Sequence, residues 1–484
     1  MRQLLTEALV IAALGGALGI LLALGGTRLL VGALPADTPR LAEVAVDLRV
    51  LAFAGAASLA CALLFGAVPA LRLTSGAMQL ALREGRGGGP HLSRRRLSST
   101  LVVAQLALGV VLVIGAGLLI RSFWEIQRVE PGFRTERLLS ARITPPQATH
   151  GTRSRQLELH RALLERVAAL PGVAQVAGTT QLPFDRGDHR SAFLIEGFTP
   201  DPNDLPLLEL RSVTPGYTEL LGIPLLGGRA LLADDGADAP PVALVDEAAA
   251  RLHWGGEDPV GRCIRYPWRG AECLTVVGVV GTVRNNDLTA EPEGAVYVPL
   301  EQRPAGALTL VVRTAGEPEA LAPALRAAVR EVDPTVPVSE MRAVDRLVAE
   351  SMERPRLAAL LLAAFAGLAL ALGAIGIYGV IAYSVQQRSR EMGVRLALGA
   401  ASTDLFGLVL RQAALLALLG GTIGLLGAIA STRVLRSLLF GVTTLDPLVF
   451  LAVPLVLAAV TLLAAFLPAR RATRVDPMEV LRSE

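Results

Sequence analysis

The chain has 484 residues, of which 52% are hydrophobic, 18% charged and 4% aromatic. A soluble domain has about 25% charged residues, so this composition is typical of a membrane protein and excludes disorder over most of the chain. The formal net charge is only +3 and every basic residue is arginine, which excludes P-loop and Schiff-base lysine chemistry and gives no support to nucleic acid as a partner.

Hydropathy divides the chain into two groups of three apolar stretches, with one large polar segment between them. A spanning helix needs about 20 apolar residues. Six stretches reach that length: 8–31, 48–71, 99–120, 357–383, 413–435 and 447–468. The first stretch follows Arg2, and a signal peptide is its alternative interpretation. The sequence thus predicts an α-helical transmembrane bundle of six spans with one large extracytoplasmic domain.

Arginine bias in the short connections predicts the orientation, because basic loops tend to stay on the cytoplasmic side. Arginines outnumber acidic residues in 72–98, in 384–412 and in the C-terminal tail, whereas loop 32–47 has more acidic residues. We therefore expect both termini to be cytoplasmic and segment 121–356 to lie outside.

Segment 121–356 has the pattern of a mixed α/β domain, in which short β-type runs alternate with helical patterns. The predicted strands are 138–144, 173–179, 207–213, 242–245, 274–280, 295–300 and 308–313, and the predicted helices are 153–169, 246–253, 317–331 and 342–353. Cys263 and Cys273 flank a predicted turn between two strands. Outside the membrane a disulfide between them is plausible, and two separately buried thiols are the alternative.

An internal repeat relates the two ends of the chain. Residues 6–30 align without gaps with residues 411–435, and in the polar flank Asp47 corresponds to Asp446. The repeat predicts that residues 1–75 hold the last two spans of a first copy, that 76–98 form a linker, and that 99–484 form a complete second copy.

Both copies keep a G-x-x-x-G pair, which is Gly15 and Gly19 in the first and Gly420 and Gly424 in the second. Small residues four apart let helix backbones approach closely in lipid. We expect these glycines to serve helix packing, either within one bundle or between the two copies or protomers.

The connection after the fourth predicted span combines basic and apolar residues. Residues 386–400 read QQRSREMGVRLALGA, which suits a short amphipathic helix along the inner membrane surface, with an ordinary basic loop as the alternative. The sequence has no HExxH, CxxC or G-x-S-x-G motif. We therefore expect no catalytic residue, no metal, no cofactor and no enzymatic activity.

Residues 390–400, REMGVRLALGA, resemble the signature of FtsX-like ABC transporter permeases. Residues 213–225, 256–261 and 276–280 resemble the MacB-type periplasmic domain of the same superfamily. The tandem arrangement is similar to that of the duplicated orphan permeases first described from acidobacteria. This chain departs from their pattern, since the first copy's opening span, outer domain, second span and signature loop are absent. We interpret it as N-terminally truncated, through a truncated gene, a misplaced start codon or fragmentation.

The resemblance implies a multi-pass protein of the bacterial inner membrane with a defined domain order. That order is 1–75, the last two transmembrane helices of a first FtsX-like copy; 76–98, a cytoplasmic linker; 99–120, a transmembrane helix; 121–356, a MacB-type periplasmic α/β domain; and 357–484, an FtsX-like permease domain with three transmembrane helices.

The resemblance also implies partners and a mechanical role. In this family a separate cytoplasmic ATPase docks on the signature loop, and by motif match this coupling helix carries Arg390, Glu391, Met392, Gly393, Arg395, Leu396 and Gly399. The lipid bilayer is a second partner, and a periplasmic adaptor or outer-membrane channel a third. Export of drugs, peptides or lipoproteins is one expected function. A non-transporting transmitter that regulates a periplasmic enzyme, or an inactive remnant, is the alternative.

Overall fold

The computed structural model divides the chain into two compact units, Met1–Val102 and Val103–Glu484. The residues that it describes are 2–33, 47–60, 90–185, 189–198, 205–267, 272–285, 287–388, 391–393, 395, 398 and 401–473. Each unit is considered by itself.

The first unit contains the long helix α1 (Arg2–Ala33) and the shorter helix Leu48–Ala60. The two helices meet at Gly16, where a Cβ atom would lie 3.2 Å from the hydroxyl of Ser58. Asp47 caps the second helix, because its carboxylate accepts a hydrogen bond from the Val50 N–H at 2.8 Å.

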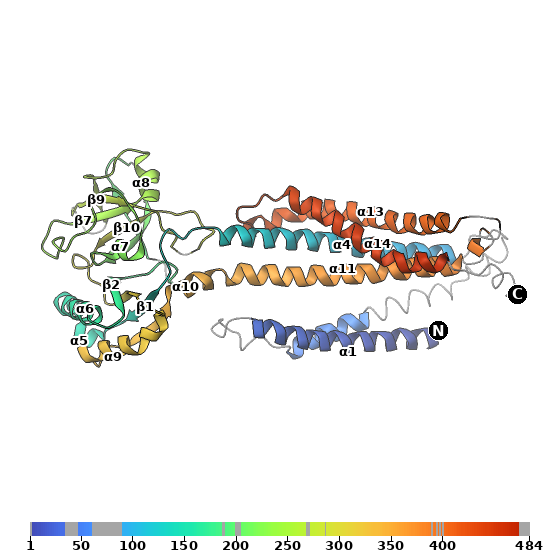
Figure 1. Cartoon of the computed structure of the whole chain (residues 1–484), viewed down its shortest axis with the longest axis horizontal. Coiled ribbons are helices and arrows are strands. Elements are labelled where there is room, and N and C mark those ends of the chain that lie inside the picture. The colour runs from blue at the N-terminus through green and yellow to red at the C-terminus, as the bar shows by residue number, and fades with distance from the viewer. Residues whose placement is uncertain are drawn as a thin grey trace. The chain divides into compact units, whose positions relative to one another are not determined.

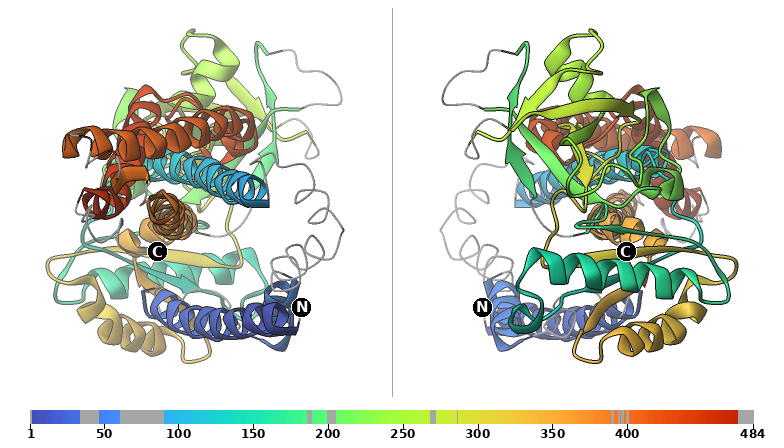
Figure 2. Two further views of the ribbon diagram at one scale, coloured as in Figure 1. Left: turned by 90° about the vertical axis from the view of Figure 1, so that its right-hand side faces the viewer. Right: turned by 90° about the vertical axis from the view of Figure 1, so that its left-hand side faces the viewer.

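The second unit includes four long helices that run side by side (Figures 1 and 2). They are α4 (Pro90–Gln127), α11 (Glu353–Gln387), α13 (Ser402–Leu435) and α14 (Pro447–Ala472). In the apolar stretch of α4 half of the residues are buried inside the protein. The corresponding share is 17% in α11, 33% in α13 and 28% in α14. Glycines of α4 let the neighbours approach: Gly109 lies against Ala369 of α11, and Gly117 against Val449 of α14. Helix α4 is therefore the central helix of this bundle.

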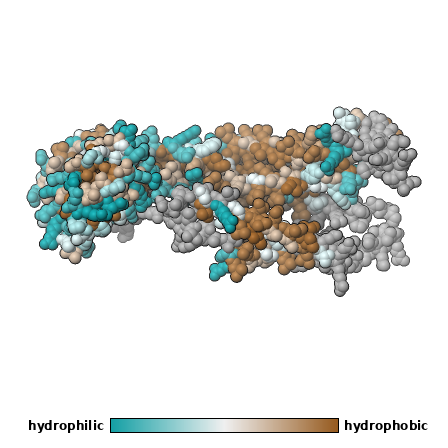
Figure 3. All heavy atoms as spheres, turned by 60° about the horizontal axis from the view of Figure 1, so that its bottom comes forward, coloured by the Kyte–Doolittle hydropathy of each residue, from teal (hydrophilic) through white to brown (hydrophobic). Residues whose placement is uncertain are grey.

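Five helices among the described residues are long and apolar enough to cross a membrane, namely Leu9–Arg28, Ser98–Gln127, Glu353–Gln387, Ser402–Leu435 and Pro447–Arg471. They correspond to five of the six predicted spans. Of the remaining prediction, 48–71, only the helix Leu48–Ala60 lies within the described residues. Figure 3 shows hydrophobic residues over the bundle and hydrophilic residues over the α/β domain.

The helices extend beyond the apolar stretches that predicted them. Helix α4 continues to Gln127, past the predicted boundary at 120, and α13 begins at Ser402 instead of 413. Hydropathy marks only the part of a helix that matches the hydrocarbon core, whereas the helix itself continues through polar turns. Residues 121–127 therefore continue α4 beyond the apolar stretch.

The α/β domain is built on one sheet of twelve strands in the order β12-β1-β11-β2-β5-β10-β7-β9-β8-β4, with β3 beside β5 and β6 beside β9. The strands are β1 (Leu138–Ile143), β2 (Val173–Thr179), β3 (Arg190–Ala192), β4 (Leu194–Ile195), β5 (Leu207–Val213), β6 (Leu225–Gly228), β7 (Val242–Asp246), β8 (Cys263–Arg265), β9 (Leu274–Val280), β10 (Ala295–Pro299), β11 (Leu308–Thr314) and β12 (Val338–Ala343).

One half of the sheet has the split βαβ arrangement, with strands in the order β12-β1-β11-β2. Helix α6 (Arg153–Ala168) connects β1 to β2, and helix α9 (Ala322–Val332), preceded by the 3-10 turn η2 (Pro318–Leu321), connects β11 to β12. The two helices lie next to each other (Figure 1). Leu163 and Val329 pack there on Ile143 and Leu310 of the sheet, all fully buried.

The other half runs from β5 to β4 and carries the short helices α7 (Tyr217–Leu221) and α8 (Glu247–Trp254). Its own core includes Phe193, Val245, Ile264 and Val296. The two halves are hydrogen-bonded through β2 and β5, which share a single antiparallel pair, Thr179 with Val213. Backbone hydrogen bonds on either side of that pair, from Thr180 to Ser212 and from Thr214 to Gly178, complete the contact.

All seven predicted strands are confirmed within one residue at each end. The predicted helices 153–169, 246–253 and 317–331 correspond to α6, α8 and η2 with α9. The prediction 342–353 is wrong at its start, since residues 342–343 belong to β12 and helix α10 spans Val344–Ser351. Strand β12 was missed because only one of its six side chains is buried.

Candidate functional site

The connection between α11 and α13 is the candidate site for a partner protein. Residues 391–393 and 395 are helical, and the Met392 N–H donates to the Arg388 carbonyl at 2.9 Å. Met392 is 4% exposed, while Glu391 and Arg395 are exposed and form an ion pair four residues apart at 2.5 Å. Leu398 is exposed, at 82%. The connection therefore has one buried side, at Met392, and one charged, open side.

Three of the seven residues predicted for the coupling helix, Arg390, Leu396 and Gly399, lie outside the described residues. The other four are Glu391, Met392, Gly393 and Arg395, and Gly393 is buried together with Met392. The structure thus places the described part of the motif directly between the end of α11 and the start of α13.

Polar contacts hold the helix ends together around this connection. The hydroxyl of Ser384 in α11 donates to the side-chain carbonyl of Gln412 in α13 at 3.2 Å. Arg471 of α14 donates to the hydroxyl of Tyr378 in α11 at 3.2 Å. These hydrogen bonds join α11 to both α13 and α14 near the connection.

The second-copy glycine pair lies where α13 meets α4. A Cβ atom at Gly420 would be 2.6 Å from Leu106 Cβ, and one at Gly424 would be 2.6 Å from Val110 Cβ. Both distances are shorter than a carbon–carbon contact, so only glycine fits at this packing distance. The first-copy glycines differ, since Gly15 and Gly19 have no described atom within 4 Å of such a Cβ.

At the opposite end of the bundle, α4 is tied to the loop between α13 and α14. Arg121 forms an ion pair with the buried Asp446, whose carboxylate also accepts hydrogen bonds from the N–H groups of Leu448 and Val449. Asp446 therefore caps α14 as Asp47 caps the helix Leu48–Ala60. The Phe440 N–H donates to the Ser122 hydroxyl at 2.8 Å.

The same loop contacts the α/β domain. Phe440 packs against a cluster that includes Phe133, Val283 and Val344, all buried in the α/β domain, and Ile126 at the end of α4. Phe440 thus connects the α13–α14 loop to the apolar cluster of the α/β domain.

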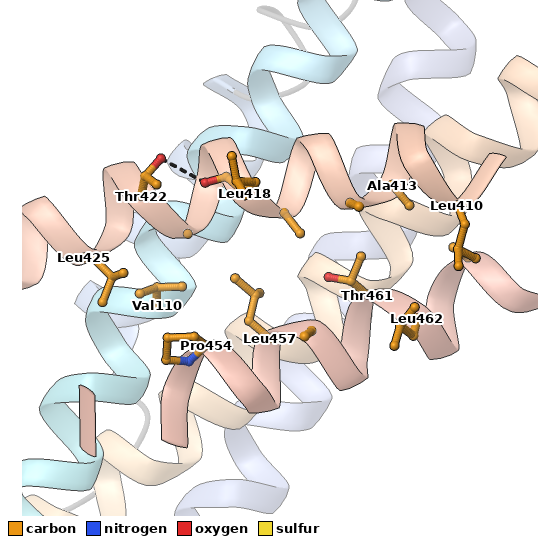
Figure 4. Close-up of a pocket in the computed structure, with 15 residues that line it drawn as sticks. Val110, Leu410, Ala413, Leu418, Thr422, Leu425, Pro454, Leu457, Thr461 and Leu462 are labelled. Carbon is orange, nitrogen blue, oxygen red and sulfur yellow. Dashed lines mark hydrogen bonds between the residues drawn. The ribbon is translucent and has the colours of Figure 1, made fainter. Parts of the chain in front are cut away.

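A cavity of about 380 Å³ lies between α13 and α14, with Val110 of α4 in its wall (Figure 4). Pro454 and Leu457 of α14 lie opposite Leu425 of α13. The Thr422 hydroxyl donates to the Leu418 carbonyl at 2.8 Å. The walls are otherwise almost entirely apolar, so the cavity suits hydrocarbon and excludes a charged ligand.

Buried polar groups lie in the middle of the α/β domain. Arg211, Tyr217 and Tyr297 are each at most 1% exposed. Asp246 is fully buried and accepts hydrogen bonds from the N–H groups of Ala249 and Ala295, both at 2.9 Å. Burial raises the pKa of Asp246 to about 6, opposed by these two hydrogen bonds and by the Arg211 guanidinium. This cluster could not be predicted from the sequence, since a single arginine in a strand is no sign of burial.

Cys263 and Cys273 are joined by a disulfide, with their Cα atoms 5.5 Å apart. The bond connects the start of β8 to the residue before β9, and these strands pair antiparallel. Among the described residues, no group of three or more histidine, cysteine, aspartate or glutamate side chains is arranged to hold a metal ion.

Apolar helices on both sides of an α/β domain define a multi-pass membrane protein with one large domain outside the bilayer. The family model of the MacB-like periplasmic core domain matches residues 99–332, and that of the FtsX-like permease C-terminal domain matches residues 363–477. The chain therefore belongs to the MacB-type ABC transporter permeases, which are inner-membrane proteins with a periplasmic segment.

Individual relatives agree with this assignment. The macrolide export ATP-binding/permease protein MacB of Marinobacter nauticus is 28% identical over 67% of this chain and 48% of its own length. The pyoverdine export ATP-binding/permease protein PvdT of Pseudomonas putida is 24% identical over 55% of this chain and 42% of its own length. The chain thus spans about half, or less than half, of the length of these curated relatives. The crystal structure of the periplasmic region of MacB from Actinobacillus actinomycetemcomitans aligns at 14% identity and a TM-score of 0.32, over 46% of this chain and 95% of that chain.

Proposed function

We propose that this chain is the permease subunit of an ABC exporter, in which a separate cytoplasmic ATPase moves the periplasmic domain through the helical bundle. The observation that carries the proposal is the α11–α13 connection, with Met392 buried and the Glu391–Arg395 pair exposed. The buried Met392 fixes the short helix to the rest of this chain. The exposed Glu391 and Arg395 remain available for polar contacts with another protein.

A continuous series of contacts supports the coupling. The connection is joined to α13, the Gly420–Gly424 face of α13 packs on α4, and both α4 and the α13–α14 loop reach the apolar cluster of the α/β domain. Tight packing transmits displacement because interdigitated side chains are not compressible. The chain itself is not proposed to be an enzyme, and with no lysine it has no Walker A residue.

The orientation that fits this role has both termini in the cytoplasm and the α/β domain in the periplasm. Arg388 and Arg395 in the connection and Arg470 and Arg471 at the end of α14 gather at one end of the bundle, as the positive-inside rule requires. Two relatives are named as exporters of a macrolide and of pyoverdine, which supports export of drugs, peptides or lipoproteins. A periplasmic adaptor or outer-membrane channel would complete the path.

The test replaces Gly393 with proline. Gly393→Pro removes an N–H and bends the short helix at a buried position, so we expect membrane insertion to persist while nucleotide-dependent export and ATPase recovery are lost. Ser402→Pro is the matched control. Ser402 is the first residue of α13, where proline is tolerated, and the preceding Ala401 already has the extended conformation (φ −68°, ψ 144°) that proline favours.

The measurement is purification of the tagged chain in mild detergent with mass spectrometry of the proteins recovered, together with export from intact cells. An ABC ATPase recovered with the wild type and with Ser402→Pro, but not with Gly393→Pro, supports the proposal. Equal recovery and equal export with Gly393→Pro contradict it. A deletion strain with envelope or cell-division defects and unchanged export favours the transmitter function instead.

A further inference from the structure

The two halves of the periplasmic sheet meet at Thr179, the last residue of β2, which pairs with Val213 of β5. Beyond that pair the Thr180 N–H donates to the Ser212 carbonyl at 2.9 Å, and the Ser212 N–H donates to the Thr180 hydroxyl at 3.1 Å. A cavity of about 360 Å³ lies at this point. Its volume is in the range of pockets that hold small molecules.

Basic side chains from three separate elements line this cavity. Arg142 comes from β1, Arg190 from β3 and Arg303 from the loop between β10 and β11. The hydroxyl residues Thr180 and Ser212 are also in the wall, and no aspartate or glutamate is among the described lining residues. Three guanidinium groups around one opening make it strongly attractive to an anion.

The carboxylates that pair with these arginines lie outside the wall. Arg142 donates through one nitrogen to Asp185 at 3.2 Å, and Arg190 pairs with Glu293 at 3.0 Å. Arg303 stacks on the Tyr266 ring, with its guanidinium carbon 4.8 Å from the ring centre. Among the described residues, no ion pair of Arg303 is found. The N–H groups at the edge of the Arg303 guanidinium can therefore bind an oxyanion, since stacking uses only the face of the guanidinium plane.

A buried hydroxyl beside Arg142 also lacks a partner. Thr309 pairs with Arg142 across β1 and β11 and is 3% exposed, and its hydroxyl has no hydrogen-bond partner among the described residues. Thr309 and Arg142 line a separate hollow of about 10 Å³, whose wall also holds Asp185 and Glu340 and which shares Arg142 with the larger cavity. An unsatisfied buried hydroxyl is uncommon in folded proteins and often indicates a group supplied by a ligand or water.

We propose that this cavity, lined by Arg142, Arg190, Arg303, Thr180 and Ser212, binds the oxyanion of a small ligand. Carboxylate and phosphate groups both match the guanidinium geometry, because each presents two oxygen atoms to a pair of N–H donors. The anionic end of a peptide and the phosphate of a lipid headgroup are the two sources of that chemistry. The site is distinct from the α11–α13 connection, so a binding test does not depend on coupling to an ATPase.

The experiment measures binding to the full chain in an uncharged detergent by isothermal titration calorimetry. The probes are inorganic phosphate, N-acetyl-dialanine with a free carboxylate, its C-terminal amide, and water-soluble dihexanoyl phosphatidic acid. We expect at least one oxyanion probe to bind at about 1 mM or lower, more weakly as salt is raised, and the amide not to bind. Tighter binding of the peptide acid indicates a peptide source, and tighter binding of the phosphatidic acid a lipid source.

Arg303→Gln is the main variant, because Arg303 has no ion pair to lose among the described residues, and we expect it to weaken binding by about tenfold or more. Arg166→Gln is the matched control, since Arg166 is an exposed arginine of α6 that pairs with Glu331 away from the cavity. Arg142→Gln is the second variant and should show the same loss. The proposal is overturned if no oxyanion probe binds, if the amide binds as well as the acid, or if Arg303→Gln and Arg166→Gln bind equally.

Discussion

Gly424 is the position at which the packing of α13 on α4 tolerates the least change. A Cβ atom there would lie 2.6 Å from Val110 Cβ and 2.7 Å from the carbonyl oxygen of Ala107. Carbon atoms in ordinary contact are about 3.5–4.0 Å apart, so Gly424→Ala has to separate the two helices by about 1 Å. The backbone of Ala107 cannot rotate aside as the end of a flexible side chain would.

The cost follows from that displacement. A gap of about 1 Å removes a quarter to a half of the dispersion attraction along the contact, and overpacking of this kind usually costs about 1–3 kcal/mol. Alanine in place of glycine also regains about 1 kcal/mol of helix propensity. We therefore expect Gly424→Ala to lower the free energy of unfolding by up to about 2 kcal/mol relative to the wild type, and by about 1–3 kcal/mol relative to a helix alanine that meets no clash.

Gly407→Ala provides the control on the same helix, because none of the described atoms lies within 4 Å of a Cβ atom at Gly407. It gains the helix propensity without the clash, so its stability should equal or exceed that of the wild type. The assay is thermal and SDS-induced unfolding of the full chain in mild detergent, followed by circular dichroism. If Gly424→Ala is as stable as Gly407→Ala, the packing argument is wrong.

Three further predictions concern single contacts. Asp446→Ala removes a helix cap and the partner of Arg121, and should lower the free energy of unfolding by about 1–3 kcal/mol in the same assay, with Asp446→Asn intermediate. Burial lowers the pKa of His160 from 6.5 to about 4, so the folded state favours the neutral imidazole. The free energy of unfolding should therefore fall by up to about 3 kcal/mol as the pH is lowered from 6.5 to 4. His160→Leu should remove this loss in unfolding measured across that pH range, and an unchanged profile would contradict the assignment. Reduction of the Cys263–Cys273 disulfide, or its replacement by two serines, should lower the free energy of unfolding by about 2–3 kcal/mol, because the closed loop is short. Mass spectrometry of alkylated protein should find no free thiol at either position before reduction.

The elements of this protein could be predicted because their signals are local. An apolar stretch of about 20 residues identifies a spanning helix wherever it packs, and alternation with turn residues located β1, β2 and β9. The helix ends could not be predicted, because polar turns at Ser402 or near Gln127 continue a helix without any hydropathy signal. Strand β12 was missed because only one of its six side chains is buried and because Glu340 has a positive φ of 48° at an irregular point of the strand.

The sequence by itself determined the membrane class, the order of spans and periplasmic domain, the α/β pattern and the residues of the α11–α13 connection. Only the tertiary structure decided which glycines lie in a helix contact, since Gly424 meets α4 whereas a Cβ atom at Gly15 has no described atom within 4 Å. It also decided that Arg142, Arg190 and Arg303 line one cavity. These residues are far apart in the chain, and their meeting depends on the order of the strands in the sheet. Such long-range pairing leaves no periodic signal in any single segment.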